Sequence, residues 1–187
     1  MSLFFTSDTH FGHSNIIKYT GRPYKNAWEM DEALIENWNR VVQPDDTVYH
    51  LGDVGFCSPA RLLSILNRLN GTINLVFGNH DRRIWEVQSR FAAMNLMDEV
   101  RVPDKDATRG VQQIVLCHYA MRVWNKRHWG AWQLYGHSHG SLPDDPNSKS
   151  LDVGVDCWGY TPVSYDQIKQ KMAEKLNRPV DHHERDD

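Results

Sequence analysis

Hydrophobic residues recur at helical spacing in four stretches of the chain, which predicts four amphipathic helices. The third stretch runs from Asp81 toward Asn95, and Gly71 is expected to end the second. Helix-starting pairs open the other three stretches, namely Asn26 with Glu29, Ser58 with Pro59, and Ser164 with Gln167. The apolar positions of the four predicted helices are Met30, Leu34, Ile35, Trp38 and Val42; Leu62, Leu63, Leu66 and Leu69; Ile84, Val87, Phe91 and Met94; and Ile168, Met172 and Leu176.

Short apolar or alternating runs of strand length separate these helices, and strands that alternate with helices predict an α/β fold. No repeat or linker divides the chain, so residues 1–176 are expected to form a single domain. Residues 177–187 (NRPVDHHERDD) hold four acids and little apolar side chain, so they are expected to form a flexible acidic tail. The predicted strands are Leu3–Thr6, Thr47–Leu51, Ile73–Phe77, Gln113–Leu116, Trp132–Tyr135 and Leu151–Val155.

Composition and charge narrow the class of protein. The 187 residues have a net charge of −3 and a mean hydropathy of −0.61, and no apolar run is long enough for a transmembrane helix. The first residues do not resemble a signal peptide, and three cysteines without a CxxC pair argue against a disulfide scaffold. We therefore expect a cytoplasmic protein. The balance of 21 basic and 24 acidic residues gives no strong signal for nucleic acid or a membrane as a partner, and the oligomeric state stays open.

Ten histidines are the unusual feature of the composition, because histidine is the commonest metal ligand. Metal-competent side chains follow five predicted strands in succession. In open α/β sheets ligands bind at the carboxyl ends of the strands, so these side chains are expected to meet at one site. They are Asp8 and His10 after the first strand, Asp53 after the second, Asn79, His80 and Asp81 after the third, His118 after the fourth, and His137 and His139 after the fifth.

The chemistry of these groups points to two metal ions. Carboxylates, imidazoles and an amide, without a thiolate, suit divalent first-row ions such as Mn, Fe, Co, Ni or Zn. Seven side chains are too many for one tetrahedral site and are about right for two ions that share a carboxylate. Gly52, Gly78 and Gly136 are expected to let the backbone turn sharply beside them. The predicted ligands are Asp8, His10, Asp53, Asn79, His118, His137 and His139.

The blocks DTH, GDV, GNHD, a lone histidine and GHSH follow one another between Asp8 and His139. This order resembles the calcineurin-like metallophosphoesterase superfamily. The resemblance implies a sandwich of two mixed β-sheets flanked by helices, with the metals at one rim. The chain is short for the superfamily, so an elaborate cap domain is not expected. The implied ligand sets are Asp8, His10 and His139 for one ion and Asn79, His118 and His137 for the other, with Asp53 as the bridge.

The resemblance also implies catalytic roles for two neighbours. His80 would lie over the substrate phosphate, stabilise the developing charge and help to protonate the leaving oxygen. Asp81 would orient that imidazole or stabilise its charge, a pairing with an acid–base rationale.

The leading functional hypothesis is a dinuclear metal-dependent phosphoesterase, in which a metal-bound hydroxide attacks phosphorus. The substrates would be phosphodiesters or phosphomonoesters, nucleotides among them. The alternative is a metal-binding scaffold or interaction module of the same fold without significant turnover. A metal-dependent hydrolase of another bond is a third hypothesis, although the HExxH motif of common metallopeptidases is missing from the sequence.

Several other residues have two interpretations. His13 either faces the phosphate or shapes its loop, and the arginines at positions 22, 82 and 83 either contact phosphate or are ordinary surface charges. In the segment Arg122–Tyr135, Trp124 and its neighbours form either a substrate wall on which a base stacks or, preferably, a loop that packs aromatic rings on the core. Candidate substrate contacts are thus His13, Arg82 and Trp124. Ordinary roles are expected for His50 as a buried strand residue, for Cys117 as a small core residue, and for His128, His182 and His183.

Overall fold

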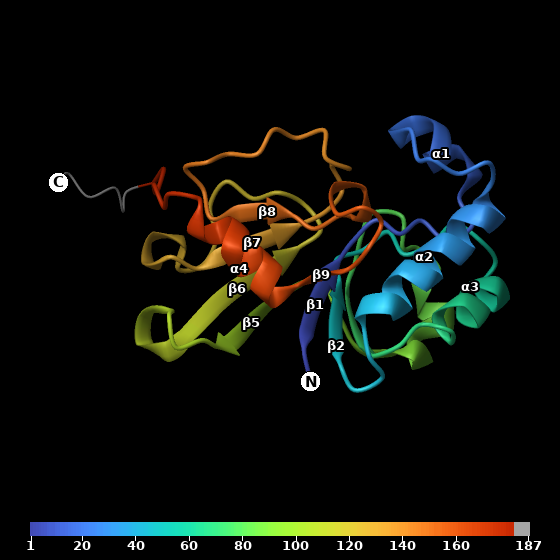
Figure 1. Ribbon diagram of the computed structural model, residues 1–187, viewed down its shortest axis with the longest axis horizontal. Coiled ribbons are helices and arrows are strands. Elements are labelled where there is room, and N and C mark those ends of the chain that lie inside the picture. The colour runs from blue at the N-terminus through green and yellow to red at the C-terminus, as the bar shows by residue number, and fades with distance from the viewer. Residues whose placement is uncertain (182–187) are drawn as a thin grey trace.

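The computed structural model describes residues 1–181, which form two β-sheets side by side with helices on the outer flank of one of them (Figure 1). The prediction of an α/β fold with two mixed sheets is confirmed. His182 and His183, and with them the end of the predicted acidic tail, lie outside the described residues. No helix within residues 1–181 is long and apolar enough to cross a membrane.

The five-stranded sheet has the strand order β4-β3-β2-β1-β9. Strands β1 to β4 are parallel to one another, whereas β9 runs antiparallel to β1. Thr6 pairs with His50, and His50 pairs with Leu75, so the carboxyl ends of β1, β2 and β3 lie at one edge of the sheet. The strands are β1 (Leu3–Thr6), β2 (Thr47–His50), β3 (Thr72–Val76), β4 (Phe91–Asn95) and β9 (Val163–Ser164).

The four-stranded sheet has the order β5-β6-β7-β8, in which β6, β7 and β8 are parallel and β5 is antiparallel to β6. A parallel bridge between Ser7 and Gly154 joins the end of β1 to the segment after β8. The two sheets therefore meet beside the carboxyl ends of their central strands, where the predicted ligands lie. The strands are β5 (Met97–Pro103), β6 (Val111–Cys117), β7 (Trp132–Tyr135) and β8 (Ser150–Asp152).

Three of the four predicted helices are confirmed as α2 (Ala27–Val41), α3 (Pro59–Leu66) and α4 (Tyr165–Ala173). The residue before each helix accepts a hydrogen bond from a backbone N–H three positions later, which satisfies a free donor of the first turn. The three capping residues are Asn26, Ser58 and Ser164.

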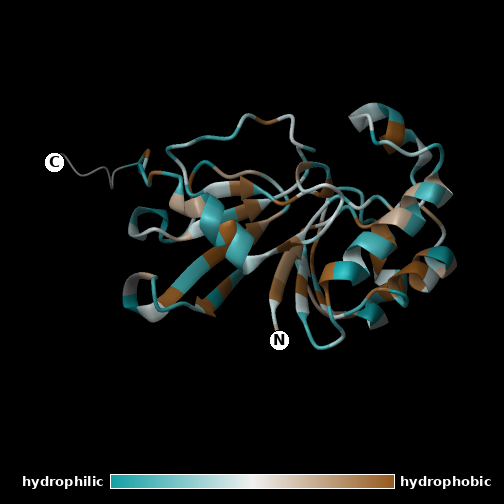
Figure 2. Ribbon diagram, viewed as in Figure 1, coloured by the Kyte–Doolittle hydropathy of each residue, from teal (hydrophilic) through white to brown (hydrophobic). Residues whose placement is uncertain are grey.

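Two apolar cores hold the layers together, because alternate side chains of a strand point to opposite faces of its sheet. Phe4 of β1 packs with α2 and α3, whereas Phe5 packs between the two sheets. Leu75 and Val76 of β3 divide in the same way. In Figure 2, α2 and α3 show both brown and teal residues, as expected for helices that bury one face.

The prediction of the third helix is wrong. Ile84–Arg90 forms a 3-10 helix and Phe91–Asn95 forms β4, which lies parallel to β3. Ile84 and Val87 are buried at the three-residue spacing of a 3-10 turn, which mimics the start of an α-helix. Pairing with β3 then determines the conformation of the following residues, so tertiary contacts override the local pattern.

Other boundaries differ in detail. Helix α3 ends at Leu66 rather than at Gly71, and Leu176 lies beyond the end of α4 with 52% of its surface exposed. The short helix α1 (Ser14–Thr20) and strands β5 and β9 were not predicted, because their polar content or brief length hides the periodicity.

Candidate metal centre

Most of the predicted ligands occupy the left-handed region of backbone conformation, directly after β1, β2 and β7. This region costs a residue with a Cβ about 1–2 kcal/mol. Residues held there tend to cluster at functional sites, where the surrounding structure enforces the strain. The φ angles are 59° at Asp8, 49° at His10, 57° at Asp53, 66° at His137 and 48° at His139.

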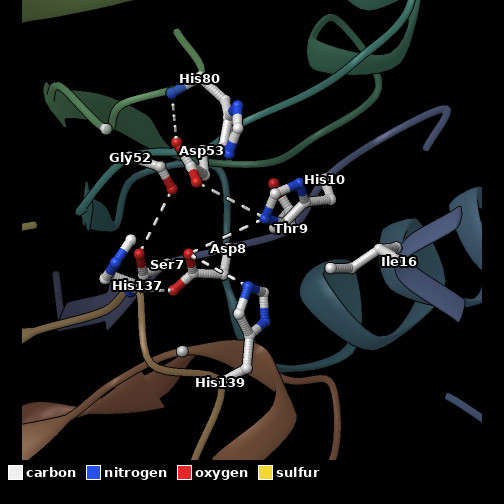
Figure 3. Close-up of polar contacts among 12 residues, drawn as sticks. Ser7, Asp8, Thr9, His10, Ile16, Gly52, Asp53, His80, His137 and His139 are labelled. Atoms are coloured by element: carbon white, nitrogen blue, oxygen red, sulfur yellow. Dashed lines mark hydrogen bonds and ion pairs between the residues drawn. The ribbon is translucent and has the colours of Figure 1, made fainter. Parts of the chain in front are cut away.

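The ligand atoms form two groups that meet at Asp53. Asp53 Oδ2 lies 3.6 Å from Nε2 of His10 in the first group and 3.6 Å from Nε2 of His118 in the second. Figure 3 shows Asp8, His10, Asp53 and His139 facing one another. Within each group the ligand atoms lie within 4.8 Å of one another; the groups are Asp8, His10 and His139, and Asp53, His118 and His137.

Each buried aspartate uses one carboxylate oxygen for the backbone and turns the other toward the ligands. Asp8 Oδ2 accepts the N–H of His137 at 2.9 Å, and Asp53 Oδ1 accepts the N–H of His80 at 2.9 Å. Among the described residues, the buried atoms Asp8 Oδ1 and His10 Nε2 have no hydrogen-bond partner. Burying such atoms without a partner is unfavourable, and a cation between them would remove that cost.

The pKa values of Asp8 and His10 also fit a cation bound between them. Burial raises the pKa of Asp8 to about 7 and lowers the pKa of His10 to about 2. The protein alone therefore stabilises neither the ionised carboxylate nor the imidazolium. A divalent cation binds an ionised carboxylate and the lone pair of a neutral imidazole, so the donor set fits divalent metal ions.

His118 is oriented by the backbone toward the second group. Its Nδ1–H donates to the carbonyl of Leu51 at 2.6 Å, which leaves a lone pair on Nε2 of the neutral ring. That Nε2 lies 3.1 Å from Oδ1 of Asn79, which is also an acceptor. Two lone pairs at this distance can share a cation, and the structure thus brings Asn79 to the second group.

Asp156 orients His139, a role that the sequence reasoning missed. His139 Nδ1–H donates to Asp156 Oδ2 at 2.7 Å, which turns Nε2 toward Asp8 Oδ1, 3.9 Å away. Although burial favours the neutral ring, this hydrogen bond and the charges of Asp8 and Asp156 raise the pKa of His139. A signal was present, because Asp156 directly follows the predicted strand Leu151–Val155, just as the predicted ligands follow other strands.

Arg22, a candidate phosphate contact from the sequence, has a structural role instead. Its guanidinium is buried and binds Asp156 through Nε and Nη2, both at 2.8 Å. It also donates to the carbonyls of Asp8 and Thr9. Although burial opposes the charge of Asp156, the hydrogen bonds from His139 and Arg22 lower its pKa to about 2.

The three glycines provide space beside the ligands, and one of them has a positive φ. Gly52 has a φ of +95°, whereas Gly78 and Gly136 have ordinary φ angles. A Cβ on Gly78 would lie 2.2 Å from Asp53 Oδ1, and a Cβ on Gly136 would lie 2.5 Å from Asp8 Oδ2. Turns also begin at Gly78 and Gly136, because their carbonyls accept the N–H groups of Asp81 and Ser138.

Asp81 holds the backbone rather than the imidazole of His80. Its carboxylate accepts the backbone N–H groups of Gly78, Asp53 and Val54 at 2.8–3.0 Å. Within residues 1–181 no hydrogen bond joins it to the ring of His80, so its observed contacts position the backbone of the two loops. His80 itself is exposed, with its ring 6.0 Å from that of His10.

Aromatic rings border both groups. Phe56 is 41% exposed, stacks on His13 at 4.1 Å between centroids and lies 4.7 Å from His80. His13 Nδ1 also lies 3.3 Å from Nδ1 of His10, so the structure places His13 at the edge of the first group. Tyr119 is 48% exposed and lies 4.8 Å from the ring of His137 beside the second group.

The remaining candidates are one exposed arginine and two residues that have other partners. Arg82 is exposed directly after Asp81, and Arg83 forms an ion pair with Glu86. Trp124 is wrong as a substrate contact, because it is 6% exposed and its indole N–H donates to the carbonyl of Ala131. The packing interpretation of this tryptophan is confirmed.

Two residues that were expected to be ordinary can also be placed. His50 is confirmed as a buried strand residue, with Nε2 2.9 Å from the hydroxyl of Thr9 and Nδ1 accepting the N–H of Gly52. Burial lowers the pKa of His50 to about 3. Cys117 is only partly buried, so its assignment to the core is wrong.

A family model and several known proteins are similar to this chain. The model of the calcineurin-like phosphoesterase superfamily domain matches residues 1–150, which contain all the predicted ligands but not Asp156. An uncharacterized protein of Methanocaldococcus jannaschii is 34% identical over 180 residues, covering 92% of each chain. Gene 66 protein of Mycobacterium phage L5 is 27% identical over 189 residues, covering 88% of this chain and 90% of that protein. A protein of unknown function from Aquifex aeolicus superposes with a TM-score of 0.66 and 22% identity, covering 91% of this chain and 98% of that one.

Proposed function

Because the chain belongs to the calcineurin-like phosphoesterase superfamily, we propose that it hydrolyses phosphodiesters or phosphomonoesters with the help of two divalent metal ions. One observation carries the proposal. Asp53 Oδ2 is equidistant from two histidine nitrogens, beside the buried and unpartnered atoms Asp8 Oδ1 and His10 Nε2. Such an arrangement of acceptors is unfavourable by itself and is suited to a pair of cations that share one carboxylate.

We propose that the residues of the centre form two ligand sets. When bound, the pair of ions supplies Lewis acidity and makes a water-derived nucleophile available near neutral pH. The protein contributes neutral imidazoles, fixed in orientation by Leu51 and Asp156, and carboxylates fixed by backbone N–H groups. The proposed sets are Asp8, His10 and His139, and Asn79, His118 and His137, with Asp53 common to both.

His80 is the proposed acid for the leaving group. Its backbone N–H is anchored on Asp53 Oδ1, which fixes its position relative to the ligands. Its exposed ring lies at the rim, 4.7 Å from Phe56, where it can donate a proton to the leaving oxygen of a bound ester. Asp81 supports this step indirectly, because its carboxylate holds the backbone of Asp53 and Gly78 in place.

The rim favours an ester with a planar leaving group. Phe56 and Tyr119 are 41% and 48% exposed beside the first and the second group of ligands. A nucleobase or another aromatic group can stack on such rings. Nucleotides and their diesters are therefore the proposed substrate class, with His13 and Arg82 as candidate contacts.

The test is to remove metal with a chelator, restore Mn²⁺, Ni²⁺ or Co²⁺, and measure hydrolysis of aryl phosphate mono- and diesters. Asp53→Ala is expected to abolish turnover and reduce bound metal, whereas Asp45→Ala, at an exposed aspartate outside the centre, keeps both. His80→Ala is expected to lower kcat by about 10²–10⁴ and to keep its metal. Two bound ions without hydrolysis of any ester would instead support a metal-binding scaffold, and full activity of Asp53→Ala would disprove the mechanism.

A further inference from the structure

A cavity far from the metal centre is lined by more basic than acidic side chains. Its volume is about 850 Å³, within the range of about 300–1,000 Å³ of small-molecule sites. Five lysines and arginines line it against two aspartates, although the chain as a whole is acidic. We call it the basic pocket; its charged lining residues are Arg101, Arg109, Lys126, Lys149, Lys169, Asp104 and Asp106.

The basic pocket lies at the opposite end of the strands that deliver metal ligands. Residues 111–113 of β6 and Trp132 of β7 line the pocket, whereas His118 and His137 follow the far ends of the same strands. At about 3.3 Å per residue, the five residues from Trp132 to His137 span roughly 15 Å. A ligand in the basic pocket therefore does not contact the metal centre.

Both carboxylates that line the pocket already have partners within the protein. Lys169 Nζ lies 2.7 Å from Asp104 and 2.7 Å from Asp106, and Asp104 also accepts the hydroxyl of Tyr165. Across residues 1–181, Arg101, Arg109 and Lys126 form no ion pair with a carboxylate. These three cations are thus available to an anion that enters the pocket.

Two of these cations are held in a strained conformation. Arg109 has a φ of 67° and Lys126 a φ of 59°, in the left-handed region. The described chain has eight such residues other than glycine, and five of them are the ligand positions of the metal centre. The same backbone conformation therefore recurs in the basic pocket, and residues held in it tend to cluster at functional sites.

An exposed aromatic ring lies beside the cations. Trp129, which also lines the pocket, has 60% of its surface exposed. Trp132, which also lines the pocket, stacks on Tyr165 with ring centroids 5.6 Å apart. An exposed indole next to several cations is the combination that recognises a base and its phosphates.

We propose that the basic pocket binds a nucleoside polyphosphate. Arg101, Arg109 and Lys126 bind its phosphates, and Trp129 stacks on its base. Its concave shape and its volume suit one nucleotide better than a continuous strand. The proposal does not rest on the phosphoesterase activity, since none of its residues belongs to the metal centre.

The experiment is calorimetric titration of the whole protein with ATP in the presence of EDTA, so that the metal centre neither binds nor hydrolyses the nucleotide. Arg109→Gly and Lys126→Gly each remove a cation at a position where glycine is unstrained, so the fold is preserved. Each substitution is expected to weaken ATP binding about tenfold, because one charge-assisted contact is lost. Lys18→Gly would disturb α1, so the matched control is Lys18→Gln, which removes an exposed cation elsewhere and is expected to leave the Kd unchanged.

The variant Trp129→Ala distinguishes recognition of the base from recognition of the phosphates. It is expected to weaken ATP binding and to leave the binding of inorganic tripolyphosphate unchanged. Equal affinity of the wild type for ATP and tripolyphosphate, unchanged by Trp129→Ala, would overturn the nucleotide assignment in favour of a general anion site. Binding of a single-stranded oligonucleotide without binding of ATP would overturn it in favour of nucleic acid, and no binding of either would refute the site.

Discussion

Gly78→Ala tests whether the close approach of two backbone segments holds the bridging aspartate in place. Gly78 has an ordinary φ, so alanine can adopt its conformation without backbone strain. The added Cβ would lie 2.2 Å from Asp53 Oδ1 and 2.4 Å from Asp53 N, whereas an ordinary contact begins at 3.4 Å. Because one of these atoms is backbone, a side-chain rotation cannot relieve the overlap, and the two segments must separate by about 1 Å.

The expected cost follows from that displacement. Forcing a methyl group into a packed site typically costs about 1–3 kcal/mol of unfolding free energy. Asp53 Oδ2 lies 3.6 Å from two histidine nitrogens, so a shift of about 1 Å moves the shared ligand out of position for at least one ion. We expect the affinity for Mn²⁺ to fall at least about 10–100-fold, as when the support of a ligand is lost.

The assay is urea unfolding of the metal-free protein together with calorimetric titration of Mn²⁺. Gly21→Ala is the matched control, because Gly21 has a φ of +67° and no atom within 4 Å of an added Cβ. It is expected to lose about 1 kcal/mol through backbone strain alone and to bind Mn²⁺ normally. A Gly78→Ala protein with the wild-type Kd for Mn²⁺ would refute the reasoning, whatever its stability.

Three further outcomes are expected. Asp156→Asn should destabilise the protein by about 3–5 kcal/mol in urea, because the fully buried guanidinium of Arg22 loses its charge partner, and metal titration should show weaker binding at His139. Ser164→Ala should cost about 1 kcal/mol by the same urea assay, since α4 loses its N-terminal cap. His50 has a folded pKa of about 3, below its unfolded value near 6.5, so its contribution to stability is complete above pH 6.5 and is lost as the pH falls toward 3. Urea midpoints measured from pH 7 to pH 4 should therefore fall less steeply for His50→Gln than for the wild type; parallel profiles would contradict this assignment.

The sequence predicted elements whose side chains repeat regularly or whose ends carry a cap. Helix α2 and strands β1 and β7 have this character, and their bounds were close to those observed. Strand β4 does not have this character. The apolar spacing around Phe91 continues that of the preceding 3-10 turn, and only pairing with β3 distinguishes the strand from the turn.

The residues of the candidate site also divide into those that the sequence predicts and those whose roles only the structure gives. Side chains at strand ends were found because local order along the chain places them there. The position of Asp156 after a predicted strand was a signal for that residue, but its pairing with Arg22 joins segments far apart in the sequence, which no local pattern reveals. Asp81 was found, but its backbone partners could be identified only once the loops had been placed.

These long-range contacts bear on how the molecule folds. The N–H of His137 bonds to Asp8 across 129 positions, and Arg22 binds Asp156 across 134. Contacts of such separation require the closure of long loops and form late in folding. The centre is therefore expected to be absent from a nascent chain until the segment after β8 has emerged from the ribosome and docked beside β1. Metal capture would then report the completion of the fold rather than nucleate it.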